Sequence, residues 1–488
     1  MITFIVNVEY TVSMSRNIVF IYLDSVRKDY FDEHASRLSA MADTTFEQCR
    51  APSGWSLPSH ASLLTGTPPH KHGISPKVNQ TFEALAPDDT FLAQLPDRHK
   101  IGVSGNTFAS HAFGFDRYFD DFISYSDSKL FQRGSVHGNV TDPAVDNSIK
   151  RYLAFLRNSL EEPAPLRTVA NGLFSKVDSE IVRRWISNFP RFDMTGGDAE
   201  RLSRIMLRMI KEAKEPFFGF VNYMDAHSPF SPESNLTEGP HDDIPSDWHS
   251  DALSGYARAT PEPFNEDTET DMKYYRHLYA NSINYLDQTV STFVEDLQAL
   301  TTRETTVVVT ADHGEDLGYP DENYMIGHSS LSEAIAHVPL IVINSPQSSP
   351  ERITEYFTQL DIGNLLVEFA NNRPVPDSVG CDRIVAESLR VGGIEKSADE
   401  NIPHLNRAVR SAWEEETRIV WDSLGTCKEY AIDQSVPSKQ EFVETRDSYP
   451  PTEQELFSRP IKSFDHAETE SIDVSDATED RLRELGYL

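Results

Sequence analysis

The run IVFIYL at residues 18–23 stops abruptly at Asp24 and decides the fold class of this chain. Its unbroken apolar, β-branched and aromatic composition indicates a strand of a parallel sheet that is buried on both faces. Comparable runs follow at residues 217–223 (FFGFVNY), 305–310 (TTVVVT) and 338–343 (VPLIVI). Amphipathic helical patterns lie between the runs, at residues 199–213 and 272–300. Strands that alternate with helices predict an α/β fold, in which a mostly parallel central sheet is flanked by helices.

Polar residues follow three of these runs near their carboxyl ends. They are Asp24 after the first run, Asp225 and His227 after the second, and Asp312 and His313 after the third. Open α/β sheets bind their ligands at the carboxyl ends of their strands. One Asp in such a place could cap a helix, but three strand ends that carry Asp or His are hard to explain as caps. Carboxylate and imidazole groups suit a divalent cation such as Mg, Ca, Mn or Zn.

The segment SGWSLPSHASLLTG at residues 53–66 begins with turn residues and then becomes apolar at helical spacing. Pro58 is favoured in a first helical turn, which puts Ser56 at or near the N-terminus of a helix. A helix N-terminus favours an anion or a developing alkoxide. The alternative is that Ser56 only caps the helix, and the segment alone leaves both interpretations open.

The 488 residues suit one large domain and a smaller one. We expect an N-terminal extension at residues 1–15, a main domain at 16–345 and a smaller C-terminal α+β subdomain at 346–488, where charged and polar residues dominate. Residues 125–195 and 232–270 lack a clean period and are interpreted as insertions or lids over the sheet.

The charge balance is strongly acidic, with 77 Asp and Glu against 44 Lys and Arg and a formal net charge of −33. Nucleic acid is therefore excluded as a partner, because phosphate binding needs clustered Lys and Arg, and an anionic membrane surface would repel the chain. Only 14 of the basic residues are Lys and 30 are Arg. Scarce Lys beside abundant Asp and Glu suggests the hypothesis of a halophilic protein, adapted to high salt that screens its self-repulsion.

Cysteine content and hydropathy bear on the compartment. Three sparse cysteines, Cys49, Cys381 and Cys427, do not form a disulfide framework. No run of 18 apolar residues predicts a transmembrane helix. The N-terminal MITFIVNVEYTVSMS lacks a basic n-region and a cleavage site, so it is not interpreted as a signal peptide, and Met14 is an alternative start. We therefore expect a cytoplasmic location. The oligomeric state is not indicated.

Five motifs occur in order along the chain. They are NIVFIYLDSVRKDYF at 17–31, GWSLPSHASLLTGTPPHKHGI at 54–74, NYMDAHSPF at 222–230, TADHGEDLG at 310–318 and EAIAHVPLIV at 333–342, followed by LRELGYL at 482–488. In this order and spacing the chain resembles the sulfatase family of the alkaline phosphatase superfamily over nearly its whole length. The resemblance implies an alkaline phosphatase-like fold, with residues 16–345 as the catalytic domain, and a metal-dependent hydrolase.

The resemblance also implies roles for single residues. Asp24, Asp312 and His313 match the family's metal ligands, and Ser56 matches the nucleophile, which in the family also contacts the metal. His227 matches the histidine near the leaving group, and His328 matches the Lys or His that contacts the substrate oxyanion. Asn106 and His60 are candidate substrate-binding residues. His72 is interpreted as structural support, and Arg27 as a residue that either assists the site or, as we prefer, pairs with Asp29.

These implied roles agree with physical chemistry. A metal ion bound to Ser56 Oγ would lower the pKa of the hydroxyl and activate it as a nucleophile. His227 could protonate the leaving oxygen as a general acid, and a protonated His328 could stabilise the equatorial oxygens.

Two departures from the family pattern matter. Hydrolytic members carry Cys or Ser in C/S-x-P-S-R, which is converted to formylglycine, whereas this chain has Ser56-Leu57-Pro58-Ser59-His60. Because His60 replaces the Arg, formylglycine is not expected and Ser56 stays an unmodified serine. Ser25 stands where sulfatases show a second Asp. Both departures point toward relatives that act on phosphoryl groups with an unmodified Ser or Thr.

Three functions are compatible with the sequence. The first is a hydrolase of sulfate or phosphate esters, including phosphodiesters and phosphonates, that acts on a small-molecule or glycan substrate. The second is a transferase of a phosphoryl-linked headgroup to a glycan or lipid, which the lack of a predicted integral membrane segment disfavours. The third is a non-catalytic binding protein with a degenerate site. The sequence does not choose between sulfate and phosphate.

Overall fold

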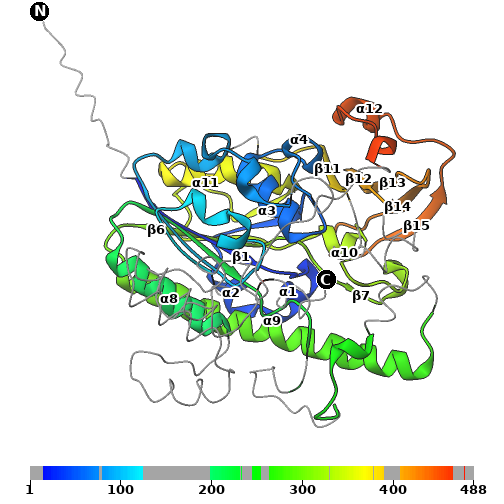
Figure 1. The fold of residues 1–488 in the computed structure, drawn as a ribbon, viewed down its shortest axis with the longest axis horizontal. Coiled ribbons are helices and arrows are strands. Elements are labelled where there is room, and N and C mark those ends of the chain that lie inside the picture. The colour runs from blue at the N-terminus through cyan, green and yellow to red at the C-terminus, as the bar shows by residue number, and fades with distance from the viewer. Residues whose placement is uncertain are drawn as a thin grey trace, which may run out of the picture.

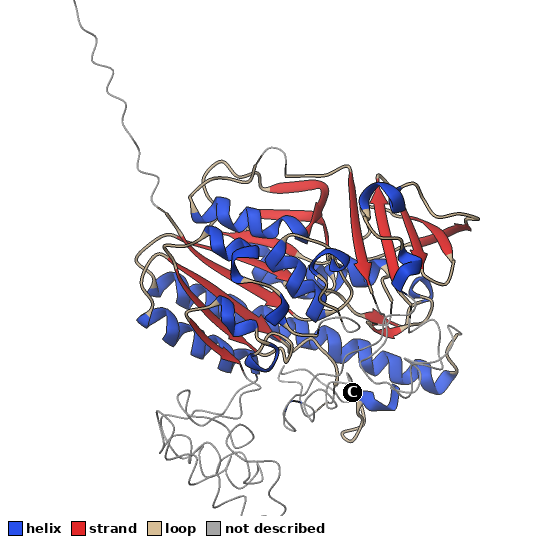
Figure 2. Cartoon of the chain, turned by 45° about the horizontal axis from the view of Figure 1, so that its top comes forward, coloured by secondary structure: helices blue, strands red, loops and turns tan. Residues whose placement is uncertain are grey.

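The computed structural model describes residues 15–75, 80–124, 198–230, 232, 244–253, 263–328, 330–376, 379–389, 407–464 and 478. Within this part of the chain two sheets stand out in Figures 1 and 2: a large one covered by helices and a smaller one formed by the C-terminal region. The expected N-terminal extension lies outside the described residues, except for residue 15. The insertion at 125–195, most of the one at 232–270 and the C-terminal motif at 482–488 also lie outside them.

The large sheet has eight strands in the order β10-β2-β9-β6-β1-β5-β3-β4. Their bounds are β1 Asn17–Leu23, β2 Thr44–Arg50, β3 His99–Ser104, β4 Asp121–Ser124, β5 Phe217–Tyr223, β6 Thr305–Ala311, β9 Leu340–Ile343 and β10 Arg352–Thr358. Every pairing is parallel except those of β9, which runs antiparallel to β2 and β6. The predicted mostly parallel α/β sheet is therefore confirmed. Strand β1 lies in the middle with every residue buried, as its apolar run predicts.

Helices cover both faces of this sheet, as Figure 1 shows. One face carries α3 (Ser56–Thr65), α4 (Pro69–His72) and α11 (Ile362–Ala370), and the other carries α1 (Lys28–His34), α2 (Ser36–Met41), α8 (Asp198–Glu212) and α9 (Glu266–Leu300). The two predicted amphipathic helices correspond to α8 and α9. Helix α9 begins earlier than its apolar pattern suggested, because the side chain of Asn265 caps it by accepting a hydrogen bond from the backbone N–H of Thr268.

The C-terminal region forms a separate five-stranded antiparallel sheet in sequential order. Its strands are β11 Arg383–Ser388, β12 Val409–Glu414, β13 Thr417–Asp422, β14 Cys427–Ala431 and β15 Glu441–Thr445, and the short helix α12 spans Thr452–Leu456. The division at residue 345 stays a prediction. Because β10 pairs with β2 and α11 packs on β1, both past that residue, we propose that the main domain extends to about residue 371.

Smaller elements lie between β6 and β9 along the chain. A two-stranded sheet joins β7 (Asp316–Leu317) to β8 (Ile326–Gly327), and the one-turn helix α10 spans Glu333–Ala336. All three cysteines are free, with Cys49 and Cys427 buried. No helix among the described residues is both long and apolar enough to cross a membrane.

Candidate active site

The carboxyl ends of four neighbouring strands bring predicted site residues to one edge of the large sheet. The residues that follow β1, β6, β3 and β5 are Asp24, Asp312, Asn106 and His227. Hydrogen bonding across the sheet continues past the strand ends, since the backbone N–H of Asp24 donates to the carbonyl of Tyr223 (2.8 Å). The N–H of Asp312 likewise donates to the carbonyl of Leu23 (3.3 Å). The sheet itself therefore fixes where these side chains begin.

Asp24, Asp312 and His313 form a compact, fully buried cluster in which the potential ligand atoms all lie within 4.8 Å of one another. Oδ2 of Asp312 has no hydrogen-bond partner in the described structure. Nδ1 of His313 donates to the carbonyl of Gly314 (2.8 Å), so Nε2 is the ring nitrogen that faces Oδ2 of Asp312, at 3.6 Å. Metal-bound histidines characteristically donate their second ring N–H to a carbonyl in this way. The residues therefore fit a divalent cation.

Ser56 contributes its hydroxyl to the same cluster. It is the first residue of α3, and the N-cap position belongs to Trp55, whose side chain makes no capping hydrogen bond. Oγ of Ser56 lies 3.2 Å from Oδ2 of Asp24 and 3.4 Å from Nε2 of His313. The alternative that Ser56 merely caps its helix is therefore wrong. Its hydroxyl points to two candidate metal ligands at the positive end of the helix.

The two carboxylates of the cluster differ in their pKa directions. Burial, and next the charge of Asp24, raise the pKa of Asp312 well above its usual range. Burial also opposes ionisation of Asp24, yet its pKa is lowered, because His227, His313 and the hydrogen bonds from Ser25 and Asn106 favour its charged form. Two adjacent buried carboxylates cannot both ionise cheaply without a cation between them, which further supports the fit to a metal ion.

Ser25 joins the two carboxylates. Its backbone has a left-handed conformation (φ 60°), and its N–H donates to Oδ1 of Asp312 (3.1 Å). Its hydroxyl donates to Oδ1 of Asp24 (2.9 Å), and its carbonyl accepts from the hydroxyl of Tyr279 on α9 (2.7 Å). Ser25 thus supplies hydrogen bonds where the family pattern has a second carboxylate. Sequence reasoning treated it only as a missing ligand.

Asn106 lies against the cluster from β3. Its Nδ2 donates to Oδ2 of Asp24 (2.6 Å), while its Oδ1 accepts from the backbone N–H of Phe108 (2.8 Å). The amide is therefore held from both ends and orients Asp24. Contact with a substrate, as the sequence suggested for Asn106, stays a prediction.

Two further histidines border the cluster. The ring of His328 lies 5.0 Å from that of His313 and 5.4 Å from those of His227 and Trp55, measured between centroids. Burial, and next the neighbouring His313 and His227, hold the pKa of His328 well below its usual value. The imidazole is thus neutral at neutral pH in the ion-free protein, which differs from the protonated form considered from the sequence.

Glu315 lies beside His328. Oε2 of this fully buried carboxylate is 3.6 Å from Nδ1 of His328, and Oε1 accepts from the hydroxyl of Tyr275 (2.6 Å). Burial raises the pKa of Glu315, although His227 opposes the shift. Tyr275 and Tyr279 were missed by sequence reasoning. Their spacing of four residues on α9 places them on one helix face, which was the available signal.

The family model for sulfatases matches residues 16–371, which is well over half of the chain. This chain belongs to the sulfatase family. Among curated proteins, the uncharacterized sulfatase YidJ of Escherichia coli (strain K12) is 25% identical over 178 residues, 34% of this chain and 34% of the relative. The aligned segment thus spans about a third of that relative's length.

Solved structures with the same fold include two phosphonate monoester hydrolases. The Silicibacter pomeroyi protein has a TM-score of 0.53 at 16% identity, over 83% of this chain and 87% of its own. The Agrobacterium radiobacter protein has a TM-score of 0.53 at 18% identity, over 85% and 89%. BT4656, solved with its substrate D-glucosamine-2-N,6-O-disulfate, has a TM-score of 0.51 at 13% identity, over 86% and 91%. At these identities the likeness concerns the fold of this sulfatase-family protein, not its substrate.

His60 of this sulfatase-family protein lies apart from the other histidines. Its ring is enclosed by Tyr22, Phe115 and Phe220, with centroid distances of 4.8, 5.6 and 6.2 Å. Its Nδ1 donates to the carbonyl of Ser56 (2.7 Å), and Nε2 has no partner among the described residues. The surroundings are those of a core residue. A substrate contact by His60 stays a prediction that this geometry does not favour.

Arg27 and His72 have structural partners in the sulfatase-family fold. The Arg27 guanidinium is buried between Asp29 (2.7 Å) and Glu322 (2.6 Å), as the preferred interpretation of the sequence had it. Nε2 of His72 is hydrogen-bonded to the hydroxyl of Ser62 on α3 (3.0 Å), which agrees with a supporting role.

Proposed function

We propose that this chain is a metal-dependent hydrolase of sulfate or phosphate esters, with Ser56 as a nucleophile that also contacts the ion. The observation that carries the proposal is the position of Ser56 Oγ, within 3.4 Å of both Asp24 Oδ2 and His313 Nε2 at the start of α3. A hydroxyl placed between two candidate ligands is where a bound divalent cation would increase its acidity.

The metal ion, when bound by Asp24, Asp312 and His313, would supply positive charge to the hydroxyl and to the group being transferred. Ser56 would lose its hydroxyl proton to solvent as the ion binds, and Oγ would then form a bond to sulfur or phosphorus while the bond to the leaving oxygen breaks. His227 would give a proton to that oxygen. Water would later give a proton back to His227 and its oxygen to the sulfur or phosphorus, which frees Ser56 Oγ as the alkoxide. Because Nδ1 of His227 is held by the carbonyl of Ser228, the transferred proton would come from Nε2.

His328 and Asn106 are the proposed substrate contacts. A neutral His328 can donate one ring N–H to an oxygen of the transferred group. Oε2 of Glu315 lies 3.6 Å from Nδ1 of the ring. Asn106 already orients Asp24, so a substrate contact would use the second N–H of its amide.

The state of Ser56 bears on the class of ester. Without formylglycine, Ser56 acts as a simple alkoxide, which suits phosphoryl groups such as phosphodiesters and phosphonate monoesters. Two structural neighbours are phosphonate monoester hydrolases, whereas a third has a sulfated glucosamine as its substrate. We favour the phosphoryl esters because His60 interrupts the modification motif.

An ester panel tests the proposal. Aryl sulfate, phosphate monoester, phosphodiester and phosphonate monoester would be offered with Mg²⁺, Ca²⁺, Mn²⁺ and Zn²⁺ to the wild type and to Ser56→Ala. We expect metal-dependent turnover of at least one ester, lost in the variant and after chelation. Equal, slow rates for both proteins on every ester would refute the hydrolase. Mass spectrometry of the peptide that contains Ser56 separates the classes: an unmodified mass supports phosphoryl chemistry, and the mass of formylglycine supports a sulfatase.

A further inference from the structure

Helix α10 contacts all three loops that carry the proposed metal site, through three consecutive carbonyls at its C-terminal end. The carbonyl of Ile335 accepts from the N–H of Gly314 (2.8 Å), and that of Ala336 from the N–H of Ala51 (2.8 Å). The carbonyl of His337 accepts from the N–H of Lys28 (3.1 Å). The last carbonyls of a helix have no partner within it, so they are available for such bonds.

The three donors stand close in sequence to the proposed ligands. Gly314 follows His313 directly, and Ala51 opens the segment that leads to Ser56. Lys28 is the first residue of α1, four residues past Asp24. Each proposed ligand loop is thus bonded to the same short helix, although the loops come from β1, β2 and β6. A shift of α10 would therefore move all three loops at once.

The approach between α10 and these loops is close. A Cβ on Gly314 would lie 2.0 Å from the carbonyl oxygen of Ala334, so only glycine fits at this position beside His313. A Cβ on Gly54, two residues before Ser56, would lie 3.0 Å from the carbonyl oxygen of Ser330 and 3.1 Å from Cγ2 of Ile335. At both glycines the nearest atom is a backbone carbonyl oxygen, which cannot move away as a flexible side chain could.

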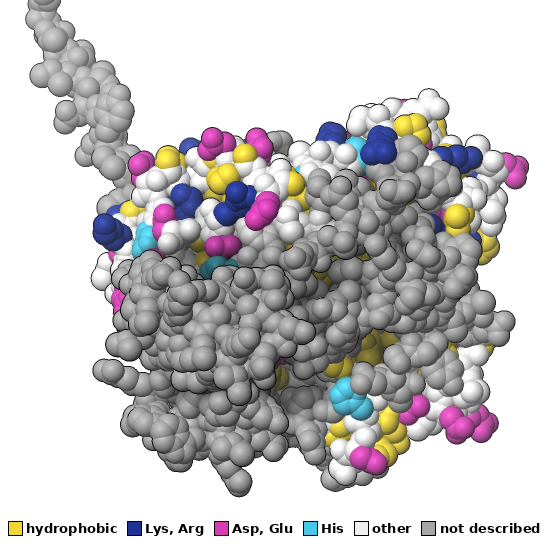
Figure 3. All heavy atoms as spheres, in the orientation of Figure 1, with side chains coloured by type: hydrophobic (Ala, Val, Ile, Leu, Met, Phe, Trp, Pro, Cys, Tyr) yellow, Lys and Arg dark blue, Asp and Glu magenta, His cyan; other side chains and the backbone are white. Residues whose placement is uncertain are grey.

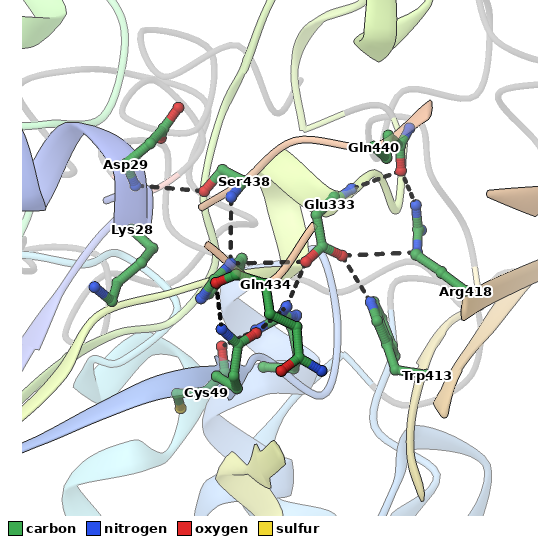
Figure 4. Close-up of polar contacts among 12 residues, drawn as sticks. Lys28, Asp29, Cys49, Glu333, Trp413, Arg418, Gln434, Ser438 and Gln440 are labelled. Atoms are coloured by element: carbon green, nitrogen blue, oxygen red, sulfur yellow. Dashed lines mark hydrogen bonds and ion pairs between the residues drawn. The ribbon is translucent and has the colours of Figure 1, made fainter. Parts of the chain in front are cut away.

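The start of α10 is hydrogen-bonded to the C-terminal sheet, as Figure 4 shows. Glu333, the first residue of α10, is fully buried, and its Oε2 accepts from Nε1 of Trp413 on β12 (2.6 Å). Arg418 on β13 donates to the carbonyl of Leu331 just before the helix. The backbone N–H of Glu333 donates to Oε1 of Gln440 (3.2 Å).

Glu333 also reaches back to the large sheet. Its Oε1 pairs with the buried guanidinium of Arg50 at the end of β2 (2.5 Å). A buried carboxylate without such partners would be strongly unfavourable, so this side chain depends on both sheets being docked. The motif EAIAHVPLIV begins at Glu333, and its residues therefore contact both sheets and the loops of the proposed site.

We propose that Glu333 and Trp413 are positioning residues, through which the C-terminal sheet holds α10 and sets the geometry of the metal and nucleophile loops. This inference rests on the proposed metal site. It assigns to the C-terminal subdomain a part in ion binding and turnover, although Trp413 itself touches no proposed ligand.

The chain offers a matched control. Trp421 on β13 donates from Nε1 to Oε2 of the buried Glu453 at 2.6 Å, the same bond and distance as in the Trp413–Glu333 pair. Glu453 belongs to α12 and is bonded to Arg410, Trp421 and the backbone of Ile461, none of which belongs to a ligand loop. Trp413→Phe and Trp421→Phe therefore remove equivalent hydrogen bonds, but only one of them holds α10.

The test uses the full chain, with three measurements on the wild type and both variants. They are the urea midpoint of unfolding without added ion, the Kd for Mn²⁺ by competition with a fluorescent chelator, and kcat and KM on the best ester of the panel. We expect similar losses of stability in both variants. Trp413→Phe should weaken Mn²⁺ binding about tenfold and lower kcat, as the loss of an outer-shell support does, while Trp421→Phe changes neither by more than about twofold.

Glu333 supplies a second comparison. Glu333→Gln keeps an oxygen for Nε1 of Trp413 and should retain more of the Mn²⁺ affinity than Glu333→Ala. Equal Mn²⁺ affinity and kcat in the two Trp variants would overturn the positioning role, whatever Glu333→Ala does to folding. A wild type that binds no Mn²⁺ and hydrolyses no ester would instead overturn the proposed function, and this inference with it.

Discussion

The hydroxyl of Ser56 and the carboxylate of Asp24, 32 residues apart in the chain, meet at 3.2 Å in the interior of the protein. Both side chains are fully buried. A serine at the start of a helix ordinarily uses its oxygen to satisfy the helix's own N–H groups. Here the oxygen faces Asp24 at the end of β1 and His313 past the end of β6 instead. These contacts are those of a reactive hydroxyl and not of a helix cap.

The first prediction concerns this hydroxyl. Ser56→Ala should lower kcat/KM by about a thousandfold or more on any ester that the wild type hydrolyses, because removal of a nucleophile abolishes the covalent route. Ser59→Ala is the matched control, since Ser59 is equally buried one turn along α3 and its Oγ only donates to the carbonyl of Ser53 (3.1 Å). We expect that control to cost about 1 kcal/mol of stability and to keep its activity. Steady-state kinetics and urea unfolding of both variants check this, and a similar loss of rate in the two would exclude Ser56 as the nucleophile.

The second prediction concerns the ion and Asp312. Because burial and Asp24 raise the pKa of Asp312, its carboxyl keeps its proton to a higher pH in the ion-free protein than a free Asp does, and a bound cation competes with that proton. The apparent affinity for Mn²⁺ should therefore rise with pH, with proton release seen by calorimetry in buffers of different ionisation enthalpy. Asp312→Asn should lose both the binding and the proton release. Affinity that does not change with pH would argue that Asp312 is not a ligand.

Much of this site can be predicted from sequence because it is built on strand ends. An unbroken apolar run followed by Asp24, or by Asp312 and His313, fixes both the strand and the place where it stops. Parallel packing then brings those ends to one edge, which is why residues nearly 300 positions apart could be grouped in advance. The helix after Ser56 was predictable in the same way, from Pro58 and the apolar spacing.

Other features depend on tertiary pairing that no local pattern contains. The run at residues 338–343 has the composition of the parallel strands, yet β9 is antiparallel, because strand direction depends on the connections and not on the composition. The contact of Trp413 with Glu333 spans 80 residues and two sheets, so neither residue was a candidate. His60 was grouped with substrate contacts by its place in a motif, whereas packing encloses it in aromatic rings.

The third prediction concerns the acid stability of the protein and His60. Burial lowers the pKa of His60 to about 4 from 6.5. Between these pH values the unfolded chain holds a proton on His60 that the folded chain does not, so the free energy of unfolding falls as the pH falls. The decrease in the free energy of unfolding that His60 causes reaches about 3 kcal/mol at most. His60→Gln, which does not titrate, should flatten this acid limb in urea titrations of the ion-free protein. An unchanged slope would place the acid sensitivity elsewhere.

The last prediction concerns salt. A net charge of −33 makes the folded chain repel itself. Salt reduces the distance over which the charges act, since the Debye screening length falls from about 10 Å at 0.1 M salt to about 3 Å at 1 M. On the described part of the face in Figure 3, acidic side chains occur in several regions and do not form one patch. The unfolding midpoint should therefore rise as KCl increases from low to molar concentration.

A matched pair of variants separates charge from the general effect of salt on burial. Exposed acidic residues such as Asp88, Glu295 and Asp296 can be changed together to Asn and Gln in one variant. That variant should be more stable than the wild type at low salt and gain less from KCl, because it carries less charge to screen. A variant in which an equal number of exposed Thr and Ser residues are replaced by Ala serves as the control. A midpoint that does not rise with KCl, or that rises equally in all three proteins, would contradict the hypothesis of adaptation to high salt.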